Sequence, residues 1–184
     1  MTLPQRFEVE GPRLFIRPWR TEDRTVFTQK FVQDADMMLY INHGRPWEEA
    51  KIEAYFDRQR KFLLACGCCV GAVVSKADGR VVGGAGIQPQ DISGDFEFAW
   101  SIWKEHWGMG LATEAALALK DHAFRTMRLA RIVAIADVPN LASIRIMQKI
   151  GMRYDGVMNA HSLAERYPDV DVVRYILENP LGGA

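Results

Sequence analysis

The chain has 184 residues, 48% of them hydrophobic, and its 23 basic side chains balance its 23 acidic ones. This length suits one compact domain with a buried core, so we expect residues 1–184 to form a single domain. A zero net charge disfavours a general binder of nucleic acid or of an anionic membrane. No apolar run approaches the roughly 20 residues that cross a bilayer, and the first residues lack the apolar core of a secretory signal. We therefore expect a cytoplasmic protein.

The three cysteines, Cys66, Cys68 and Cys69, lie together, and the rest of the sequence has none. Three neighbouring thiols cannot all pair with one another. A zinc site needs about four ligands, and the nearest histidines in sequence, His43 and His106, are far away. We expect buried cysteines in a strand, where the thiol behaves as a small hydrophobic group, and no metal.

The Gly and Pro residues divide the chain into short elements without repeats or linkers. Thr21 is expected to cap a first helix that has an acidic first turn, and Asp78-Gly79 is a strong hairpin signal. The expected strands cover residues 14–17, 68–75, 80–87, 96–103, 131–136 and 172–177, and the later helices cover residues 46–62, 111–126 and 140–150. A strand meander followed by alternating strands and helices predicts a mixed α+β fold.

The turn from Trp107 to Glu114 places Gly108 and Gly110 between a strand and a helix. Free N–H groups of a first helical turn, together with the positive end of the helix dipole, favour an anion such as a phosphate pair. A single Gly-x-Gly is weak evidence. The third glycine of a dinucleotide fingerprint is missing and no Gly-Lys-Ser/Thr follows, so the Rossmann and P-loop interpretations are disfavoured.

Four segments in the same order resemble the GNAT superfamily, in the form of its ribosomal-protein N-acetyltransferase (RimJ/RimL-like) branch. They are Glu105-His106-Trp107-Gly108-Met109-Gly110-Leu111-Ala112-Thr113-Glu114-Ala115; Arg13-Leu14-Phe15-Ile16-Arg17-Pro18 with Glu22-Asp23; Asn140, Ser143, Lys149, Gly151 and Met152; and Asp171 with Tyr175. The resemblance implies a twisted, mostly antiparallel sheet of about six or seven strands with a splayed parallel central pair, flanked by about four helices.

The resemblance also implies N-acetyl transfer from acetyl-CoA to a primary amine by direct attack. The acceptor would be a peptide N-terminus or a small-molecule amine, and a homodimer is possible. The residues expected to bind acetyl-CoA are Ile102, Trp107, Gly108, Met109, Gly110, Leu111, Ala112, Thr113 and Asn140. An acyl-CoA-binding regulatory or interaction module with little turnover is the alternative.

Glu97 is the candidate general base, because it is the one ionisable residue in an apolar strand, where a carboxylate is costly unless it is paired or faces a wet cleft. A surface or ion-paired glutamate is the structural alternative, and Asp95 beside it reads as a turn residue. Many GNAT enzymes protonate the leaving thiolate with a tyrosine, but this chain has Met147 at the matching position. The resemblance leaves Ser143 as the polar group near the sulfur, unless its hydroxyl only bonds a helix carbonyl.

Overall fold

The structure is a computed structural model, and it describes residues 7–90, 92–163, 167–180 and 182. The strands are β1 (Val9–Glu10), β2 (Leu14–Arg17), β3 (Val70–Ser75), β4 (Val81–Pro89), β5 (Phe96–Ile102), β6 (Arg131–Asp137), β7 (Arg153–Asn159) and β8 (Asp171–Glu178). The α-helices are α1 (Asp23–Phe27), α2 (Ala35–Asn42), α3 (Glu49–Cys66), α4 (Leu111–Asp121) and α5 (Leu141–Lys149). One π-helical turn follows α1 at Thr28–Val32, and another follows α4 at His122–Thr126.

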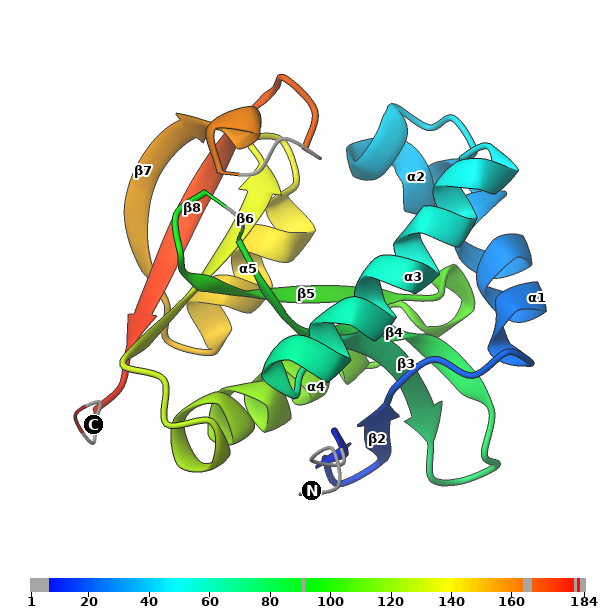
Figure 1. Cartoon of the computed structure of the whole chain (residues 1–184), viewed down its shortest axis with the longest axis horizontal. Coiled ribbons are helices and arrows are strands. Elements are labelled where there is room, and N and C mark those ends of the chain that lie inside the picture. The colour runs from blue at the N-terminus through cyan, green and yellow to red at the C-terminus, as the bar shows by residue number, and fades with distance from the viewer. Residues whose placement is uncertain (1–6, 91, 164–166, 181, 183–184) are drawn as a thin grey trace.

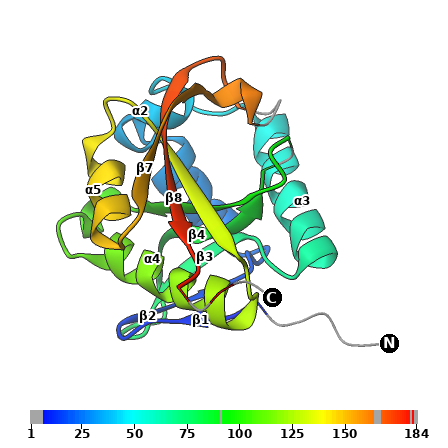
Figure 2. The same cartoon turned by 90° about the vertical axis from the view of Figure 1, so that its left-hand side faces the viewer.

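The strands form one sheet in the order β1-β2-β3-β4-β5-β6-β8-β7 (Figure 1). All neighbouring pairs are antiparallel except β5 and β6, which are parallel. Helices α4 and α5 lie on one side of the sheet and α3 lies on the other (Figure 2). The chain thus has the α+β architecture that the sequence predicted, with the parallel pair in the interior of the sheet.

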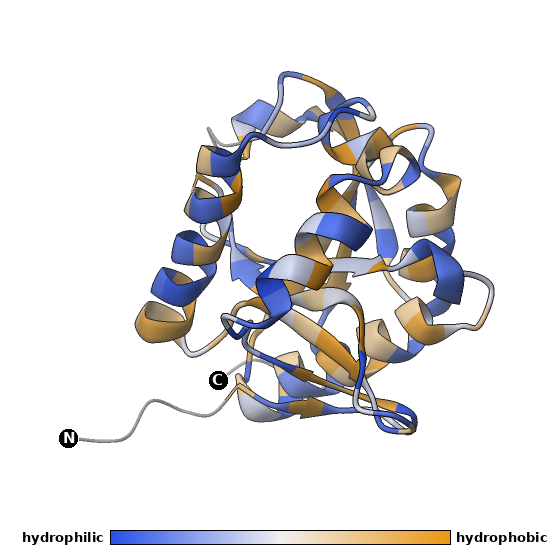
Figure 3. Cartoon of the chain, turned by 90° about the vertical axis from the view of Figure 1, so that its right-hand side faces the viewer, coloured by the Kyte–Doolittle hydropathy of each residue, from blue (hydrophilic) through white to orange (hydrophobic). Residues whose placement is uncertain are grey.

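Two of the three apolar clusters among the described residues contain most of the core. The larger one joins β-strand residues to the buried face of α4, where Ala115, Ala116 and Leu119 are fully buried. The smaller one is aromatic and packs Phe27 and Phe31 beneath α3. Hydrophilic and apolar residues alternate along α3 (Figure 3), as expected of a helix with one buried face. None of the helices within the described ranges has both the length and the apolar character that a bilayer span requires.

The six expected strands are confirmed as β2 to β6 and β8, within a few residues at their ends. Strands β1 and β7 and helix α2 were not predicted. Among the described residues, the sheet has eight strands, compared with the six or seven expected, and there are five α-helices, compared with about four. Strand β1 has only two residues. Helix α2 begins at a cap that was overlooked, because the Asp34 side chain accepts hydrogen bonds from the N–H groups of Asp36 at 2.9 Å and Met37 at 3.1 Å.

Two local expectations were wrong. Thr21 does not cap α1, whose N-cap residue is Glu22, with no capping hydrogen bond from its side chain. Instead, the buried Asp23 carboxylate binds Arg17 through two contacts of 2.6 and 3.0 Å. The cysteines are not strand residues either. Cys66 ends α3, and the buried Cys68 and Cys69 precede β3.

The parallel strands β5 and β6 are held together at one end. Their register contains the pair Glu97 with Val133, near the start of both strands. Asp95, just before β5, is 8% exposed and binds Arg131 of β6 at 2.8 Å and Arg174 of β8. Asp95 is therefore more than the turn residue that was expected, because its carboxylate ties three strands together where the parallel pair begins.

Replacing Asp95 with asparagine should destabilise the fold. The change removes one of two carboxylates that pair with the mostly buried Arg174 guanidinium, the other being Asp155 at 3.4 Å. We expect a loss of about 2–3 kcal/mol, less than for a fully buried pair because Asp155 remains and Arg131 is half exposed. Urea denaturation measures this loss. Asp121→Asn is the control, since Asp121 and Arg125 form an exposed pair at 3.8 Å. Equal losses in the two variants would contradict the assignment.

Candidate active site

A cavity of about 470 Å³ lies where β5 and β6 diverge. Its walls come from β4, β5, β6, α2, α3, α5 and the segment around Tyr167. Among the predicted site residues, Glu97, Asn140 and Ser143 line this cavity together. Ile102 and residues 107–113 are not part of its lining, so the structure divides the predicted residues between a cavity and a separate glycine turn.

The Glu97 carboxylate is 3% exposed, which excludes the interpretation as a surface residue. Gln88 donates from Nε2 to Glu97 Oε1 at 2.6 Å, and Gln90 donates from Nε2 to Glu97 Oε2 at 2.7 Å. The Tyr167 hydroxyl also donates to Oε1. Hydrogen bonds to a buried carboxylate offset the cost of its desolvation. The surrounding donors therefore stabilise the Glu97 carboxylate inside an otherwise apolar strand.

A chain of side-chain amides fixes the donors of Glu97. Gln59 of α3 is 2% exposed, accepts from the N–H of Val70 at 2.8 Å and donates to Gln88 Oε1 at 3.2 Å. These two bonds orient the Gln88 amide so that its NH₂ group faces Glu97. On the other side, the Ser93 hydroxyl donates to Gln90 Oε1 at 2.8 Å and orients that amide in the same way.

Ser143 lies across the cavity, on the first turn of α5. The Trp100 indole donates from Nε1 to Ser143 Oγ at 2.9 Å. Because the Ser143 oxygen accepts this bond, its own proton stays available for an acceptor in the cavity. Asn140 is the N-cap of α5, as its local sequence predicted, and its side chain accepts from the Ser143 N–H at 3.1 Å. Met147 on the same helix is completely buried.

The glycine turn before α4 leaves backbone donors pointing outward. Gly108 and Gly110 have φ of +77° and +75°, which only glycine adopts readily, and a Cβ built on Gly108 would meet nothing within 4 Å. The first backbone bond of α4 runs from Glu114 N–H to Gly110 O. The N–H groups of the preceding helical residues have no partner within the helix, as at any helix start.

Side chains hold this turn in place. Glu114 accepts from the N–H of Arg13 at 2.6 Å and from Arg13 Nε at 2.7 Å, while the same guanidinium donates to the Met109 carbonyl at 3.1 Å. Trp107 donates from Nε1 to Ile102 O at 2.7 Å and so ties the turn to the end of β5. Glu105 binds Lys30 at 2.8 Å, and this hydrogen bond lowers the pKa of Glu105.

The edge of β5 that faces β6 carries backbone groups beyond the register pair with β6. Trp103 N–H donates to Val82 O on the β4 side at 2.8 Å. The backbone groups of successive residues point alternately to the two sides of a strand, so those of Ile102 and Trp100 point toward β6. The Ile102 carbonyl already accepts from Trp107 Nε1. The two strands have already diverged there, because their register contains only Glu97 with Val133.

Charges of both signs line the cavity. Besides Glu97, the lining contains the carboxylate of Asp137. Burial raises the pKa of Asp137, and the nearby His43 lowers it by a smaller amount. Lys51 and Arg58 of α3 supply the positive charges. Burial also raises the pKa of Tyr55 well above its usual value, so this phenol keeps its proton.

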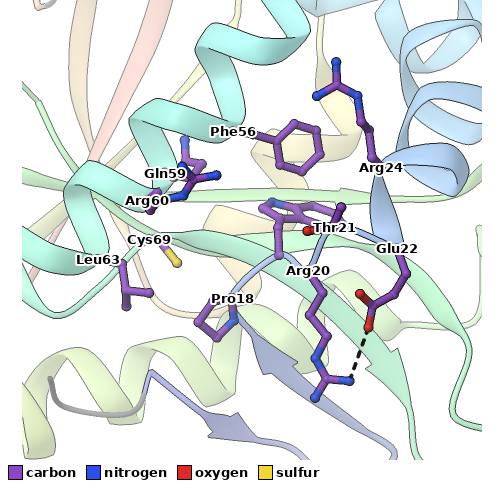
Figure 4. A pocket seen from close by; sticks show the side chains of 11 residues that line it. Pro18, Arg20, Thr21, Glu22, Arg24, Phe56, Gln59, Arg60, Leu63 and Cys69 are labelled. Carbon is purple, nitrogen blue, oxygen red and sulfur yellow. Dashed lines mark ion pairs between the residues drawn. The ribbon is translucent and has the colours of Figure 1, made fainter. Parts of the chain in front are cut away.

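A second cavity, of about 450 Å³, lies between α1 and α3 (Figure 4). Three arginines surround it: Arg20, Arg24 and Arg60. Each of them forms an ion pair with a nearby carboxylate. Arg20 pairs with Glu22 at 3.9 Å, Arg24 with Glu49, and Arg60 with Asp57 at 3.4 Å. This cavity contains none of the predicted site residues, and its positive charges are already balanced. The first cavity is therefore the candidate active site.

Sequence reasoning missed most of the groups that surround Glu97. Gln88 and Gln90 occupy alternate positions at the end of an apolar strand, and this pattern of two polar residues facing one way could have revealed them. Tyr167 lies in a loop whose path no local pattern predicts. Of the described residues, no group of three His, Cys, Asp or Glu side chains could hold a metal ion.

Comparison with known proteins agrees with this geometry. The family model "Acetyltransferase (GNAT) domain" matches residues 13–153. A probable N-acetyltransferase of Bacillus subtilis, YjcK, is 32% identical over 163 residues, which are 81% of this chain and 85% of the relative. The spermidine N(1)-acetyltransferase of Escherichia coli K12 is 26% identical over 154 residues, with 77% and 73% covered.

A solved structure of similar fold is that of RimL, a ribosomal L7/L12 alpha-N-protein acetyltransferase in complex with coenzyme A. It matches with a TM-score of 0.74 and 14% identity over 93% of this chain and 97% of that one. This identity establishes the fold alone. The family match and the relatives show that the chain belongs to the GNAT acetyltransferase family and is an enzyme of the N-acetyltransferase class.

Proposed function

We propose that this enzyme transfers the acetyl group of acetyl-CoA to a small primary amine by direct attack, with Glu97 as the general base. The observation that carries the proposal is the buried Glu97 carboxylate, which accepts hydrogen bonds from three of the described residues in the cavity where β5 and β6 diverge. Ser143 and Asn140 reach the same cavity from α5. A protein N-terminus, the acceptor of the RimJ/RimL-like branch, is the other candidate.

The residues of the glycine turn fit the pyrophosphate of acetyl-CoA. The open space in front of Gly108 allows an anion to approach the backbone, and the first-turn N–H groups of α4 can donate to it. From Trp107 to Thr113 the turn carries no acidic side chain that would repel phosphate. The backbone groups of Trp100 and the N–H of Ile102, on the edge of β5 that faces β6, then suit the amide-containing arm of the cosubstrate, and they lead from the turn toward Glu97.

In the proposed reaction, Glu97 accepts a proton from the substrate ammonium. The free amine attacks the thioester carbonyl carbon, the C–N bond forms and the C–S bond breaks, and its electron pair goes to sulfur. A backbone N–H on the exposed edge of β5 stabilises the negative charge on the carbonyl oxygen. Ser143 donates its hydroxyl proton to the leaving sulfur and regains a proton from the attacking nitrogen as the amide forms, while Trp100 keeps the Ser143 oxygen in place. Glu97 then releases its proton to water.

The demand on Glu97 depends on the acceptor. Deprotonating a lysine-like amine at neutral pH costs roughly 4–5 kcal/mol, whereas an α-amino group costs about 1–1.5 kcal/mol. A thiolate with a pKa near 8.5 leaves without a strong acid. The geometry therefore asks more of the base than of the hydroxyl at Ser143.

Glu97→Gln should lower kcat/KM by about 100-fold or more, the usual contribution of a general base, because the amide cannot take the proton. Coenzyme A release during amine acetylation measures the rate, and calorimetry should show nearly unchanged binding of coenzyme A. Glu53→Gln on the exposed face of α3 is the matched control. If Glu97→Gln keeps its full rate, Glu97 is not the base. Tight binding of coenzyme A without acetylation of any amine would instead favour a binding module.

Ser143→Ala should reduce kcat by about tenfold or less, because a hydroxyl is a weak acid and the thiolate leaves readily. Steady-state rates at saturating substrates measure the effect. Trp100→Phe is the companion variant, since it removes the indole donor and keeps the hydroxyl. A full kcat in Ser143→Ala would exclude a role for this proton.

Gly108→Ala should weaken coenzyme A binding by about tenfold or more, because the new methyl group fills the space through which phosphate approaches the backbone. Calorimetry measures the affinity. Gly79→Ala is the matched control, since Gly79 also has a positive φ, +71°, and open space around it, but lies in the β3–β4 hairpin. Both variants bear the same backbone strain, so equal affinities for coenzyme A would contradict the anion site.

A further inference from the structure

Two of the three cysteine thiols touch each other at the end of α3. Cys66 is the last residue of the helix and Cys68 follows after Gly67, with 3.5 Å between the two Sγ atoms. Cys66 is partly exposed, whereas Cys68 is buried. The reaction proposed above uses neither thiol, so this pair is available for a chemistry of its own.

We propose that Cys66 and Cys68 form a reversible disulfide, and that its formation lowers the rate of acetyl transfer by displacing the support of Glu97. The disulfide itself depends only on the two thiols. Its effect on the rate rests on the proposed function, because it assumes that Glu97 is the base.

The backbone between the two cysteines permits the bond. Residues separated by one other residue have Cα atoms at most about 7 Å apart, and a disulfide requires about 4.4–6.8 Å. Gly67 has a φ of +72°, and this left-handed turn ends α3 and brings the two side chains together. From their separation of 3.5 Å, the sulfur atoms must approach by about 1.5 Å to reach the bonded distance of about 2 Å.

Oxidation by a small disulfide such as oxidised glutathione gives a balanced reaction. The Cys66 thiolate attacks one sulfur of the small disulfide, a mixed disulfide forms, and the first glutathione thiolate leaves. The Cys68 thiolate then attacks the Cys66 sulfur, the protein disulfide forms, and the second glutathione thiolate leaves. The two cysteine protons end on the two glutathione thiols. The protein thus loses two hydrogen atoms, and one small disulfide is reduced.

Exposure determines which cysteine reacts first. Reagents in solution reach Cys66, which lies near the exposed Leu64 at the end of α3. Burial raises the pKa of Cys68 well above its usual range, so this thiol stays protonated and reacts poorly with external reagents. Once Cys66 carries glutathione, the Cys68 sulfur is already beside the atom that it must attack. This proximity favours the internal step over a reaction with a second external molecule.

The short loop makes the disulfide easy to reduce again. Only Gly67 separates the two cysteines, so the bond removes little chain entropy from the unfolded state and is weakly stabilised. Cys66 is also partly exposed, and exposed disulfides are of the labile rather than the structural kind. We therefore expect a bond that follows the thiol–disulfide balance of its surroundings.

The thiol pair is linked to Glu97 through Gln59. Two residues after Cys68, the Val70 N–H donates to Gln59 Oε1 at 2.8 Å. Gln59 in turn orients the Gln88 amide, which donates to Glu97. Drawing Cys68 toward the end of α3 displaces the chain that leads into Val70. A misplacement of about 1 Å can cost an enzyme about 100-fold in rate, and we expect oxidation to lower kcat by about tenfold.

The first experiment measures the disulfide itself on the full-length protein. After reduction, the denatured wild type should show three reactive thiols, and after incubation with oxidised glutathione only one, with a mass lower by two hydrogen atoms. Cys69→Ala is the matched control, because Cys69 lines the second cavity (Figure 4) and its replacement should leave the pair intact. Cys66→Ser and Cys68→Ala should form no internal disulfide.

The second experiment measures the rate after the small thiols and disulfides are removed, with acetyl-CoA consumption followed by its thioester absorbance. Oxidised wild type should have a kcat about tenfold lower than the reduced protein, with nearly unchanged affinity for coenzyme A by calorimetry, and dithiothreitol should restore the rate. Cys66→Ser keeps a hydroxyl that can donate to the Phe62 carbonyl, as the thiol does, and should keep its rate under both conditions.

Gln59→Leu separates the proposed link from a general effect of oxidation. This variant lacks the amide that orients Gln88, so it should start with a low kcat and lose little more on oxidation. If it loses as large a factor as the wild type, or if the disulfide forms without a change in kcat, the link to Glu97 is wrong.

The remaining outcomes concern the pair and the proposed function separately. If the wild type keeps three thiols in oxidised glutathione, or if Cys66→Ser still forms an internal disulfide, the assignment of the pair is wrong. A protein that forms the disulfide but acetylates no amine contradicts the proposed function, and with it the effect on the rate, while the disulfide stands.

Discussion

The parallel pair β5 and β6 is the constraint on which the rest of the site depends. Asp95 binds Arg131 and Arg174 at the start of the pair, and beyond the register pair of Glu97 with Val133 the strands separate. Backbone groups in a sheet interior are normally paired, because an unpaired buried group costs free energy. Strands that diverge in the middle of a sheet must find other partners for those groups, and a bound amide-containing ligand can supply them.

Hydrogen bonds explain why a carboxylate can be buried at Glu97, where the two strands are still paired. An isolated charge in this position would be strongly unfavourable, but Gln88 and Gln90 of the neighbouring strand β4 and its loop, together with Tyr167, each donate a hydrogen bond to it. Gln59 and Ser93 fix the amides that donate. The carboxylate is therefore held in one orientation before any substrate arrives, and an acceptor amine meets a base that needs no reorganisation.

Most of the fold could be predicted because its strands and helices carry periodic apolar patterns, and the strand before the glycine turn was located correctly. Strand β7 was missed because its residues are mostly exposed and its pairing with β8 shifts register at Gly156, which interrupts the alternation. The position of Glu97 in an apolar strand indicated a special role. Its partner Tyr167 and the cations of α3 could not be placed, because their proximity depends on how distant segments pack.

The two groups of positive charge in this protein act on different scales. At the glycine turn, the positive end of α4 and its first-turn N–H groups provide a fixed partial charge. This charge favours anions over other ligands but does not select anions by size. On α3, the Lys51 and Arg58 side chains lie over the Trp47 and Tyr55 rings, in a cavity whose lining also contains Glu97 and Asp137. The first arrangement suits a cosubstrate common to many enzymes. The second depends on side chains that the fold does not require, so selection for a particular acceptor can act on α3 while the strands and the turn stay the same.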